Sequence, residues 1–503
     1  MDNIIVITQN VKLQSLASLR KFLKDGSETL VVSTQFIFEN ETEQIQDALG
    51  TKCLYKNFSD LLSDADWDRC DTEAYSDKTK NLADYYATIK EIKNQAIVNK
   101  VLLDYPCDNK YLVCDDLGID EDVWLDAGFK KIECEYYHDR EDYQIKIKKR
   151  SALRNVASKF KGLLSKIYRA LRNDIYVANI DGQKHLFFGS MNRIAYRLNT
   201  EFTKASIFEN IKFVCIYISN LLLGYVPKNN VIRMSTLHEG TMWSFPDHPN
   251  FNLKLMQDGY LPPNYSSKYL LFNGKYVEYY TWDKLGQMTF DYHHLKSRVI
   301  PFRNKLYLPK PNYPTSIKKV LCVASGAGDW TAVKNRSDED KMIHAFGKIA
   351  AMFPDIEFIY RCHPVWIHPL HQGVNSISRA AEYIDYLNLP NFNISCNIPN
   401  ANADGKFILS YKRSSFEDDL KDVDVVFGEH SISMIDAAFK NILFASCNVT
   451  GRRDFFAGIT AMGFPHCENI FEIKSLLEII TTPEFKVSYE QAIKNYNEMT
   501  DKE

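Results

Sequence analysis

The sequence lacks the features that mark secreted, membrane-spanning and disulfide- or zinc-stabilised proteins. The N-terminus has no basic segment followed by a long apolar stretch, so no secretory signal is expected. The 11 cysteines occur singly, without the C-x-x-C spacing of a zinc site or the pairs of a disulfide framework. The most apolar run, residues 213–226, is shorter than the ~20 residues that span a bilayer. These absences predict a cytoplasmic protein with reduced thiols.

The sequence also lacks an excess of charge of one sign. Its 61 Lys and Arg residues nearly balance 64 Asp and Glu residues, which leaves a formal net charge of -3. No RNA- or DNA-binding motif occurs, so nucleic acid is not an expected partner. With 503 residues, of which 45% are hydrophobic, the chain is long enough for two or three separate cores.

The glycine-containing loop at residues 325–331 matches neither a Walker loop nor a dinucleotide fingerprint, because it lacks their later glycines and lysine. ATP or NAD binding by that route is therefore not expected. Ser325, Gly326 and Gly328 would still let backbone N–H groups approach a phosphate. The pattern leaves two interpretations open, a ligand-binding loop and a plain connection.

What the sequence does contain is an alternation of strand and helix patterns that occurs twice. Strands are predicted at residues 4–7, 29–33, 53–55, 111–114 and 131–134, and again at 320–324, 356–360, 423–427 and 442–445. Such alternation predicts parallel sheets. Three prolines within residues 308–314 resemble a semi-rigid linker between the two series. We therefore expect an α/β protein with two Rossmann-like domains, at 1–310 and 316–485, and a C-terminal tail at 486–503.

A helical, partly basic insertion is expected to interrupt the first domain near residues 143–227, and short strands are predicted at 175–180, 231–234, 269–272 and 277–280 among loop-rich segments. Ten Lys and Arg residues occur between 146 and 172 without one Asp or Glu, and apolar residues recur among them at helical spacing. One interpretation is a helix that docks on an anionic membrane face, where each cation contributes ~1 kcal/mol. The other is a helix packed on the protein with a solvated basic face. Both remain open.

Two strand ends in the second domain carry candidate ligand-binding residues. The apolar run 358–362 stops at a His-Pro pair, so Arg361, His363 and Pro364 would stand at the carboxyl end of a buried strand, where such sheets bind ligands. The second candidate end carries Glu429, Ser431 and Ser433, ahead of a predicted helix. Arg, His and hydroxyl groups suit a phosphate, and Glu429 suits ribose hydroxyls. Strand-end capping is the plainer alternative for each.

These motifs resemble those of GT-B glycosyltransferases, which combine two Rossmann-like domains with a nucleotide-binding C-terminal half. More narrowly, the His-Pro pair and the Ser431-Ile432-Ser433 segment resemble the HP and S/T motifs of bacterial sialyl-, polysialyl- and Kdo transferases. Teichoic-acid polymerases carry a related His-Pro. The resemblance implies that His363 and the hydroxyls bind the phosphate of a CMP- or CDP-activated donor, and that the N-terminal domain takes the acceptor.

The same families have an acidic pair before glycine that supplies the catalytic base. The best match here is the segment 236–240, in which His238 replaces the first acid and Glu239 keeps the second. Glu239 would deprotonate an acceptor hydroxyl, with His238 as the spare candidate. The pair Asp115-Asp116, after a predicted strand, is a rival site.

The sequence thus predicts a metal-independent glycosyltransferase without a cofactor, which moves a nonulosonic acid or Kdo from a CMP-linked sugar nucleotide to a bacterial surface-polysaccharide acceptor, a glycan or glycolipid. It would be cytoplasmic or peripheral on the inner face of the membrane. The alternatives are a CDP-polyol phosphotransferase, a GT-B enzyme that uses UDP- or GDP-sugars, and a non-catalytic scaffold in polysaccharide assembly.

Overall fold

The computed structural model describes two compact units. The described residues are 1–8, 11–74, 82–114, 119–136, 175–180, 183–188, 203–204, 206–211, 215, 233–236, 253–256, 277–281, 297–299, 307–324, 336–362, 375–396, 412–429, 431, 433–449 and 457–501. Unit 1 comprises Met1–Ser76, Ala83–Asp142 and Pro309–Gln491, and unit 2 comprises Asp77–Leu82, Tyr143–Leu308 and Ala492–Glu503. The predicted linker at 308–314 lies where unit 1 resumes. The predicted domain limits and their acceptor and donor roles stay predictions.

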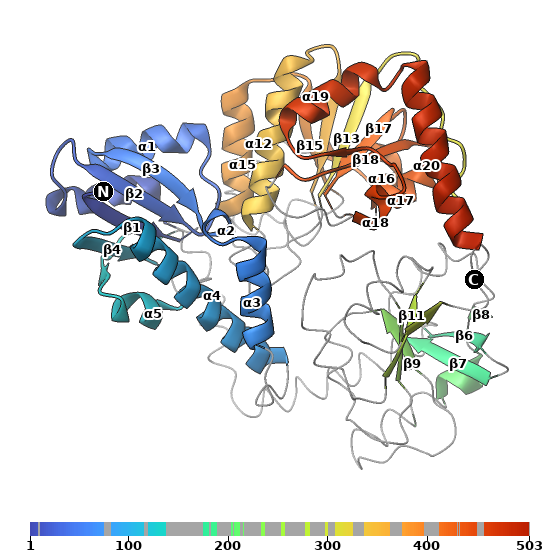
Figure 1. Cartoon of the computed structure of the whole chain (residues 1–503), viewed down its shortest axis with the longest axis horizontal. Helices are drawn as coiled ribbons and strands as arrows, with labels where there is room; N and C mark the ends of the chain where they lie inside the picture. Colours follow the sequence, from blue (N-terminus) through green and yellow to red (C-terminus); the bar gives the residue numbers. More distant parts are fainter. Residues whose placement is uncertain are drawn as a thin grey trace. The chain divides into compact units, whose positions relative to one another are not determined.

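Unit 1 begins with a five-stranded parallel sheet in the order β3-β2-β1-β4-β5 (Figure 1). Its strands are β1 (Asn3–Ile7), β2 (Glu28–Ser33), β3 (Lys52–Asn57), β4 (Asn109–Val113) and β5 (Lys130–Lys131). Alternate residues of β1 enter different cores: Ile4 and Val6 pack on one face, whereas Ile5 and Ile7 pack on the other. A strand buried on both faces needs such a continuous apolar run.

Helices cover both faces of this first sheet. One face packs against 3-10 helix η1 (Leu13–Phe22) and α1 (Glu39–Leu49). The other packs against α2 (Phe58–Leu61), α3 (Asp64–Ala74), α4 (Leu82–Asp104) and α5 (Glu121–Asp126). Figure 1 shows α1 and α4 on opposite sides of the strands.

The second sheet of unit 1 has seven parallel strands in the order β16-β15-β14-β13-β17-β18-β19. They are β13 (Lys319–Val323), β14 (Glu357–Arg361), β15 (Phe392–Cys396), β16 (Lys412–Arg413), β17 (Val425–Gly428), β18 (Leu443–Cys447) and β19 (His466–Cys467). Its helices are α12 (Arg336–Met352), α15 (Asn375–Leu387), α16 (Phe416–Asp419), α17 (Ser433–Ala438), α18 (Ala457–Thr460), α19 (Ile470–Ile479) and α20 (Pro483–Asp501). The predicted α/β class with two Rossmann-like sheets is confirmed. The predicted tail at 486–503 coincides with most of α20.

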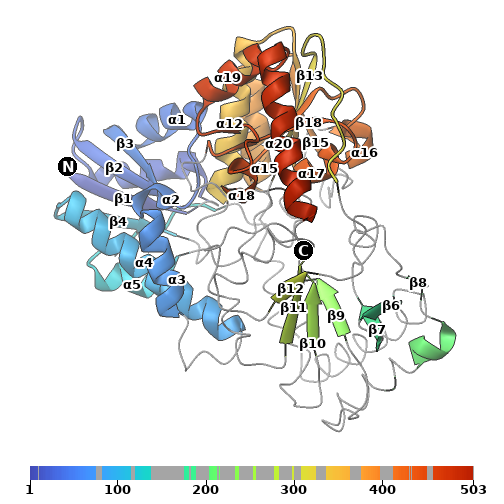
Figure 2. The same ribbon diagram turned by 45° about the vertical axis from the view of Figure 1, so that its right-hand side comes forward.

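Helix α12 joins the two sheets of unit 1. Lys348 Nζ lies 2.7 Å from Glu39 Oε1 at the start of α1, and His344 Nε2 lies 3.3 Å from the same oxygen. Lys341 forms an ion pair with Asp60 of α2. Figures 1 and 2 both place α12 and α15 next to α1. The elements that follow β2 and β3 are therefore held against the helix that follows β13.

Unit 2 contains a sheet of its own, and the strands predicted at 175–180, 231–234 and 277–280 coincide with or overlap three of its strands. Its seven strands run in the order β12-β11-β10-β9-β7-β6-β8, with β6 antiparallel to β7 and β8, and with β7, β9, β10, β11 and β12 mutually parallel. They are β6 (Ile175–Ile180), β7 (Gln183–Phe188), β8 (Thr203–Lys204), β9 (Arg233–Thr236), β10 (Leu253–Met256), β11 (Val277–Thr281) and β12 (Ser297–Val299).

The basic segment 146–172 lies outside the described residues, so its docking stays a prediction. In the part of the chain that the structure describes, no helix combines the length and the apolar character needed to cross a bilayer.

Candidate functional site

The two predicted ligand-binding strand ends, those of β14 and β17, flank β13 at the carboxyl edge of the second sheet. The strand order reverses at β13, which pairs with β14 on one side and with β17 on the other. Val323, the last residue of β13, is in register with Arg361 of β14 and with Gly428 of β17. Ligands of doubly wound sheets bind outside the carboxyl ends of the strands at such a reversal.

The structure describes four of the predicted site residues: Arg361, Glu429, Ser431 and Ser433. The others lie outside the described residues and stay predictions, namely His238, Glu239, Ser325, Gly326, Gly328, His363 and Pro364. The rival pair Asp115-Asp116 is also outside them. Strand adjacency still brings the starts of three predicted loops together, because each leaves β13, β14 or β17 at the same edge.

The turn from β17 into α17 depends on a glycine. A Cβ atom on Gly428 would lie 2.9 Å from Cγ2 of Val323 and 3.0 Å from Sδ of Met434, both shorter than ordinary contacts. Met434 also donates its backbone N–H to the carbonyl of Ser431 at 3.1 Å. Gly428 thus lets α17 approach β13 closely, which places buried Glu429 and Ser431 at the edge.

Buried carboxylates set the electrostatics of this edge. Glu429 is only 3% exposed. Burial, and then the charge of Glu429, raise the pKa of the Cys447 thiol well above its ordinary range. The pKa of Cys322 is raised in the same way, first by burial and then by neighbouring groups that include Glu339. These thiols therefore stay protonated, which argues against a nucleophilic or thiolate-ligand role.

Tyr360 contributes a second buried acid–hydroxyl contact. Its hydroxyl donates to Oε2 of Glu339 in the first turns of α12, and both side chains are buried. Burial, followed by the charge of Glu339, raises the pKa of Tyr360 far above its ordinary range, so the phenol remains a donor at neutral pH. The contact fastens α12 to β14 beside the edge.

Arg361, predicted as a phosphate ligand, has an ionic partner within the protein. Its Nη1 donates to Oδ2 of Asp419 and, at 3.2 Å, to the carbonyl of Ser414. The guanidinium lies 5.7 Å from the ring centroid of Phe416. The Arg361 side chain is 10% exposed and that of Asp419 is fully buried. A phosphate at this edge would meet a neutral ion pair and not an isolated cation.

Asp419 is a residue that the sequence analysis missed. Its Oδ2 also accepts from Ser395 Oγ at 2.5 Å, and its Oδ1 accepts from Ser414 Oγ. The only sequence signal nearby is the pair Ser415 and Asp418, which form a capping box and mark the start of α16. A capping box predicts the helix but not which later side chain turns inward.

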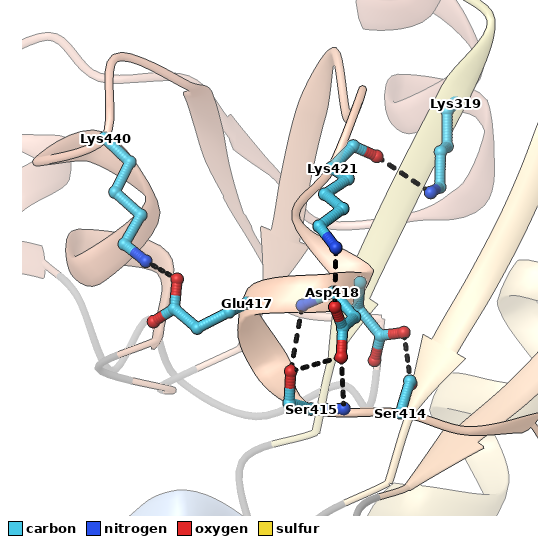
Figure 3. Close-up of polar contacts among 8 residues, drawn as sticks. Lys319, Ser414, Ser415, Glu417, Asp418, Lys421 and Lys440 are labelled. Atoms are coloured by element: carbon cyan, nitrogen blue, oxygen red, sulfur yellow. Dashed lines mark hydrogen bonds and ion pairs between the residues drawn. The ribbon is translucent and has the colours of Figure 1, made fainter.

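Exposed ion pairs surround the other side of α16 (Figure 3). Lys421 Nζ lies 2.7 Å from Oδ1 of Asp418, and this hydrogen bond, followed by those from Ser415, lowers the pKa of Asp418 to about 2. Glu417 pairs with Lys440, and Lys319 Nζ donates to the carbonyl of Lys421 at 2.9 Å. These contacts are solvent-accessible, so they fix α16 less firmly than the buried Asp419 does.

The described part of this edge contains one buried carboxylate and one buried hydroxyl that follow β17. Glu429 offers carboxylate oxygens, and Ser431 offers a hydroxyl. Among the residues that the structure describes, no group of three or more His, Cys, Asp or Glu side chains is arranged to hold a metal ion.

No protein-family model and no curated protein matches the chain. Among solved structures, a trehalose-6-phosphate protein of E. coli bound with UDP-2-fluoro glucose aligns at 11% identity and a TM-score of 0.31, over 68% of this chain and 91% of that one. A trehalose 6-phosphate synthase of Burkholderia multivorans aligns at 10% identity and a TM-score of 0.32, over 67% and 81%. A structure described as a UDP-N-acetylglucosamine 2-epimerase of Listeria monocytogenes aligns at 9% identity and 0.29, over 98% and 90%. At such TM-scores these likenesses carry no argument, and the fold assignment comes from the strand order.

Proposed function

We propose that the protein is a glycosyltransferase that moves a sugar of the nonulosonic acid or Kdo type from a CMP-activated donor to a bacterial surface-polysaccharide acceptor. The nucleotide occupies the carboxyl edge of the second sheet at the reversal between β13 and β17. Glu429 accepts hydrogen bonds from ribose hydroxyls, and Ser431 and Ser433 donate to the phosphate. His363 completes the phosphate site.

One observation carries this proposal. The strand order brings Arg361 and the Glu429–Ser433 segment, which the sequence indicates separately, to strand ends on either side of β13 at the edge where such sheets bind ligands. The motif resemblance supports the choice of a CMP-linked donor. The second Rossmann-like sheet in the same chain supports the two-domain arrangement of a glycosyltransferase.

Isothermal titration with CMP, CDP, UDP and GDP tests the proposal. Tightest binding of CMP supports a CMP-linked donor, whereas a preference for CDP favours a CDP-polyol phosphotransferase. A preference for UDP or GDP would move the protein to another donor class. Binding of none of the four would contradict the proposal and favour a non-catalytic scaffold. Incubation with activated sugars and acceptor glycans then identifies the reaction.

Glu239 is proposed as the base that deprotonates the acceptor hydroxyl. Glu239→Gln should lower kcat by roughly 10²–10⁴ and leave nucleotide affinity unchanged, because a base acts on the acceptor and not on the leaving phosphate. His238→Gln is the matched control in the same segment. Full activity of Glu239→Gln, with loss in His238→Gln, would transfer the role to His238.

A further inference from the structure

One buried carboxylate ties together the carboxyl ends of three neighbouring strands. Asp419 accepts from Arg361 at the end of β14, from Ser395 in β15 and from Ser414 directly after β16. Asp419 and Ser395 are fully buried, and Ser414 is 8% exposed. We call these four side chains the Asp419 network. It sits at the same edge of the sheet as the proposed nucleotide site.

The backbone already secures the end of β14 on both sides. Ala324 donates its N–H to the carbonyl of Arg361, and Cys362 donates to the carbonyl of Ser395, each at 3.0 Å. These bonds fix the strand but leave the long Arg361 side chain its rotamers. The Asp419 network removes that freedom, since the guanidinium contacts a carboxylate, a carbonyl and the Phe416 ring.

The charge of the network also matters for a phosphate. A buried carboxylate is costly unless its oxygens are paired, and here both oxygens accept hydrogen bonds. The pair Arg361–Asp419 is neutral overall, yet the guanidinium has further N–H groups beyond Nη1 with which it can donate. It would act as an oriented donor and not as a mobile cation.

We infer that Asp419 is a positioning residue of the nucleotide site, which holds Arg361 and the end of β14 in the geometry that recognises the donor's phosphate. The inference rests on the proposed function and deepens it. His363 follows Arg361 by two residues in the sequence, so the same strand end leads into the predicted phosphate ligand. Supporting groups of this kind are needed to keep a binding site within a fraction of an ångström of its working geometry.

The experiment compares the affinity for a nucleotide with that for its nucleoside. The wild type is titrated with CMP, CDP, UDP and GDP, and the best of these is then competed with the matching nucleoside. Asp419→Asn should lower the nucleotide affinity by roughly ten- to a hundredfold while nucleoside affinity changes little, because only the phosphate contact is displaced. If the ion pair were purely structural, its removal would leave the preference for nucleotide over nucleoside unchanged.

The matched control is Asp424→Asn at the opposite edge of the same sheet. The Asp424 carboxylate accepts the backbone N–H groups of Lys318 and Lys319, at 2.7 and 2.9 Å, ahead of β17. Its loss should lower stability without altering the nucleotide preference. Equal loss of preference in both variants, or a wild-type preference in folded Asp419→Asn, would overturn the inference.

A second variant covers the case in which Asp419→Asn does not fold. The double variant Arg361→Met/Asp419→Leu removes both charges, so it leaves no buried ion unpaired, and such replacements are often tolerated. It should fold and lose the preference for the nucleotide. A folded double variant with the wild-type preference would overturn the inference while leaving the proposed function intact. A wild type that binds none of the four nucleotides would overturn both.

Discussion

The two parallel sheets of unit 1 share a central pattern but differ at their carboxyl edges. Near the carboxyl edge of the first sheet, one acid, Glu41 in the first turn of α1, is buried, and the other buried polar side chains are neutral, namely Thr8, Ser33, Thr34, Gln35 and Asn57. Near the carboxyl edge of the second sheet, four acids are buried, Glu339, Asp340, Asp419 and Glu429, together with the neutral Ser395, Ser414, Ser431, Ser446 and Asn448. The same strand order therefore supports two different chemistries.

The two carboxyl edges also differ in how their buried polar groups are hydrogen-bonded. Neutral groups can be satisfied locally, as when Ser33 Oγ accepts the N–H of Gln35 at 3.2 Å and Asn57 Oδ1 accepts that of Ser59 at 2.9 Å. A buried carboxylate is costly unless its oxygens are paired, and Asp419 obtains its donors from three separate strand ends. At the first edge, by contrast, Glu41 accepts the nearby backbone N–H of Phe38 at 2.9 Å.

The strongest test of this comparison breaks the charged edge. Arg361→Ala leaves the Asp419 carboxylate buried without its cation, so the free energy of unfolding should fall by about 3–5 kcal/mol. Urea unfolding followed by fluorescence measures the loss. Lys421→Ala, which removes an exposed partner of Asp418, is the control and should produce no resolvable change. Equal midpoints for Arg361→Ala and the wild type would show that the pair is not part of the fold's stability.

In the core beside the first sheet, a substitution between uncharged residues should also lower stability, by a smaller amount. Trp124 is fully buried, and its Nε1–H donates to Oδ1 of buried Asn94 at 2.8 Å. Trp124→Phe keeps an aromatic ring beside Phe58 but leaves the Asn94 oxygen without that donor, at a cost of about 1–3 kcal/mol. Urea unfolding again measures the change. The double variant Trp124→Phe/Asn94→Leu removes both partners and should recover part of the loss, whereas additive losses would contradict the hydrogen-bond explanation.

The smallest expected effect lies where α12 meets α1, and it depends on pH. Burial lowers the pKa of His344 from its ordinary 6.5, although Glu39 opposes this, and Lys348 lowers it further. The unfolded chain therefore binds a proton at a higher pH than the folded one, so stability falls as pH drops below about 6.5. His344→Gln should lose less stability than the wild type between pH 7 and pH 5, by less than about 1 kcal/mol. The midpoints of urea unfolding of both proteins are measured at pH 7 and pH 5. Equal losses of stability in the wild type and in His344→Gln would contradict the prediction.

The titration of Glu39 does not overlap the pH range of that measurement. Its burial would raise its pKa, but hydrogen bonds from Lys348 and His344 outweigh burial and lower it from 4.5. The stability that Glu39 contributes is therefore present above pH 4.5 and is lost only as pH falls through the lowered value. This window lies below the one in which His344 titrates.

Local patterns were sufficient to predict the two sheets of unit 1. The run Ile4–Ile7 and the segments around Val31, Leu321 and Val426 are continuous apolar strands, and each is found in β1, β2, β13 or β17. The residues of segment 13–22 have an apolar spacing that predicts a helix, and the structure contains a 3-10 helix there. Hydrophobic periodicity cannot distinguish the two helix types over so short a segment.

The parts that were not predicted depend on partners far away in the sequence. In the sheet of unit 2, the strands predicted at 175–180, 231–234 and 277–280 are found, whereas most of the others have two to four residues and give too little periodicity to be recognised. The role of Asp419 depends on Arg361, 58 positions earlier in the chain. No local pattern indicates which of the adjacent acids Glu417, Asp418 and Asp419 turns inward. The contacts at this carboxyl edge could be recognised only after the strand order had placed these residues together.

The position of β13 and β1 at the centre of their sheets has a consequence for folding kinetics. Val320 of β13 pairs with Val425, and Asn3 of β1 pairs with Asn109, so one of the two pairings of each central strand joins segments about a hundred residues apart. Closing such a loop costs chain entropy before the pairing is rewarded, and non-local pairings of this kind slow folding. Both sheets of unit 1 should therefore acquire their central strand pair late, and the edge at which the proposed nucleotide site lies should be among the last regions to form.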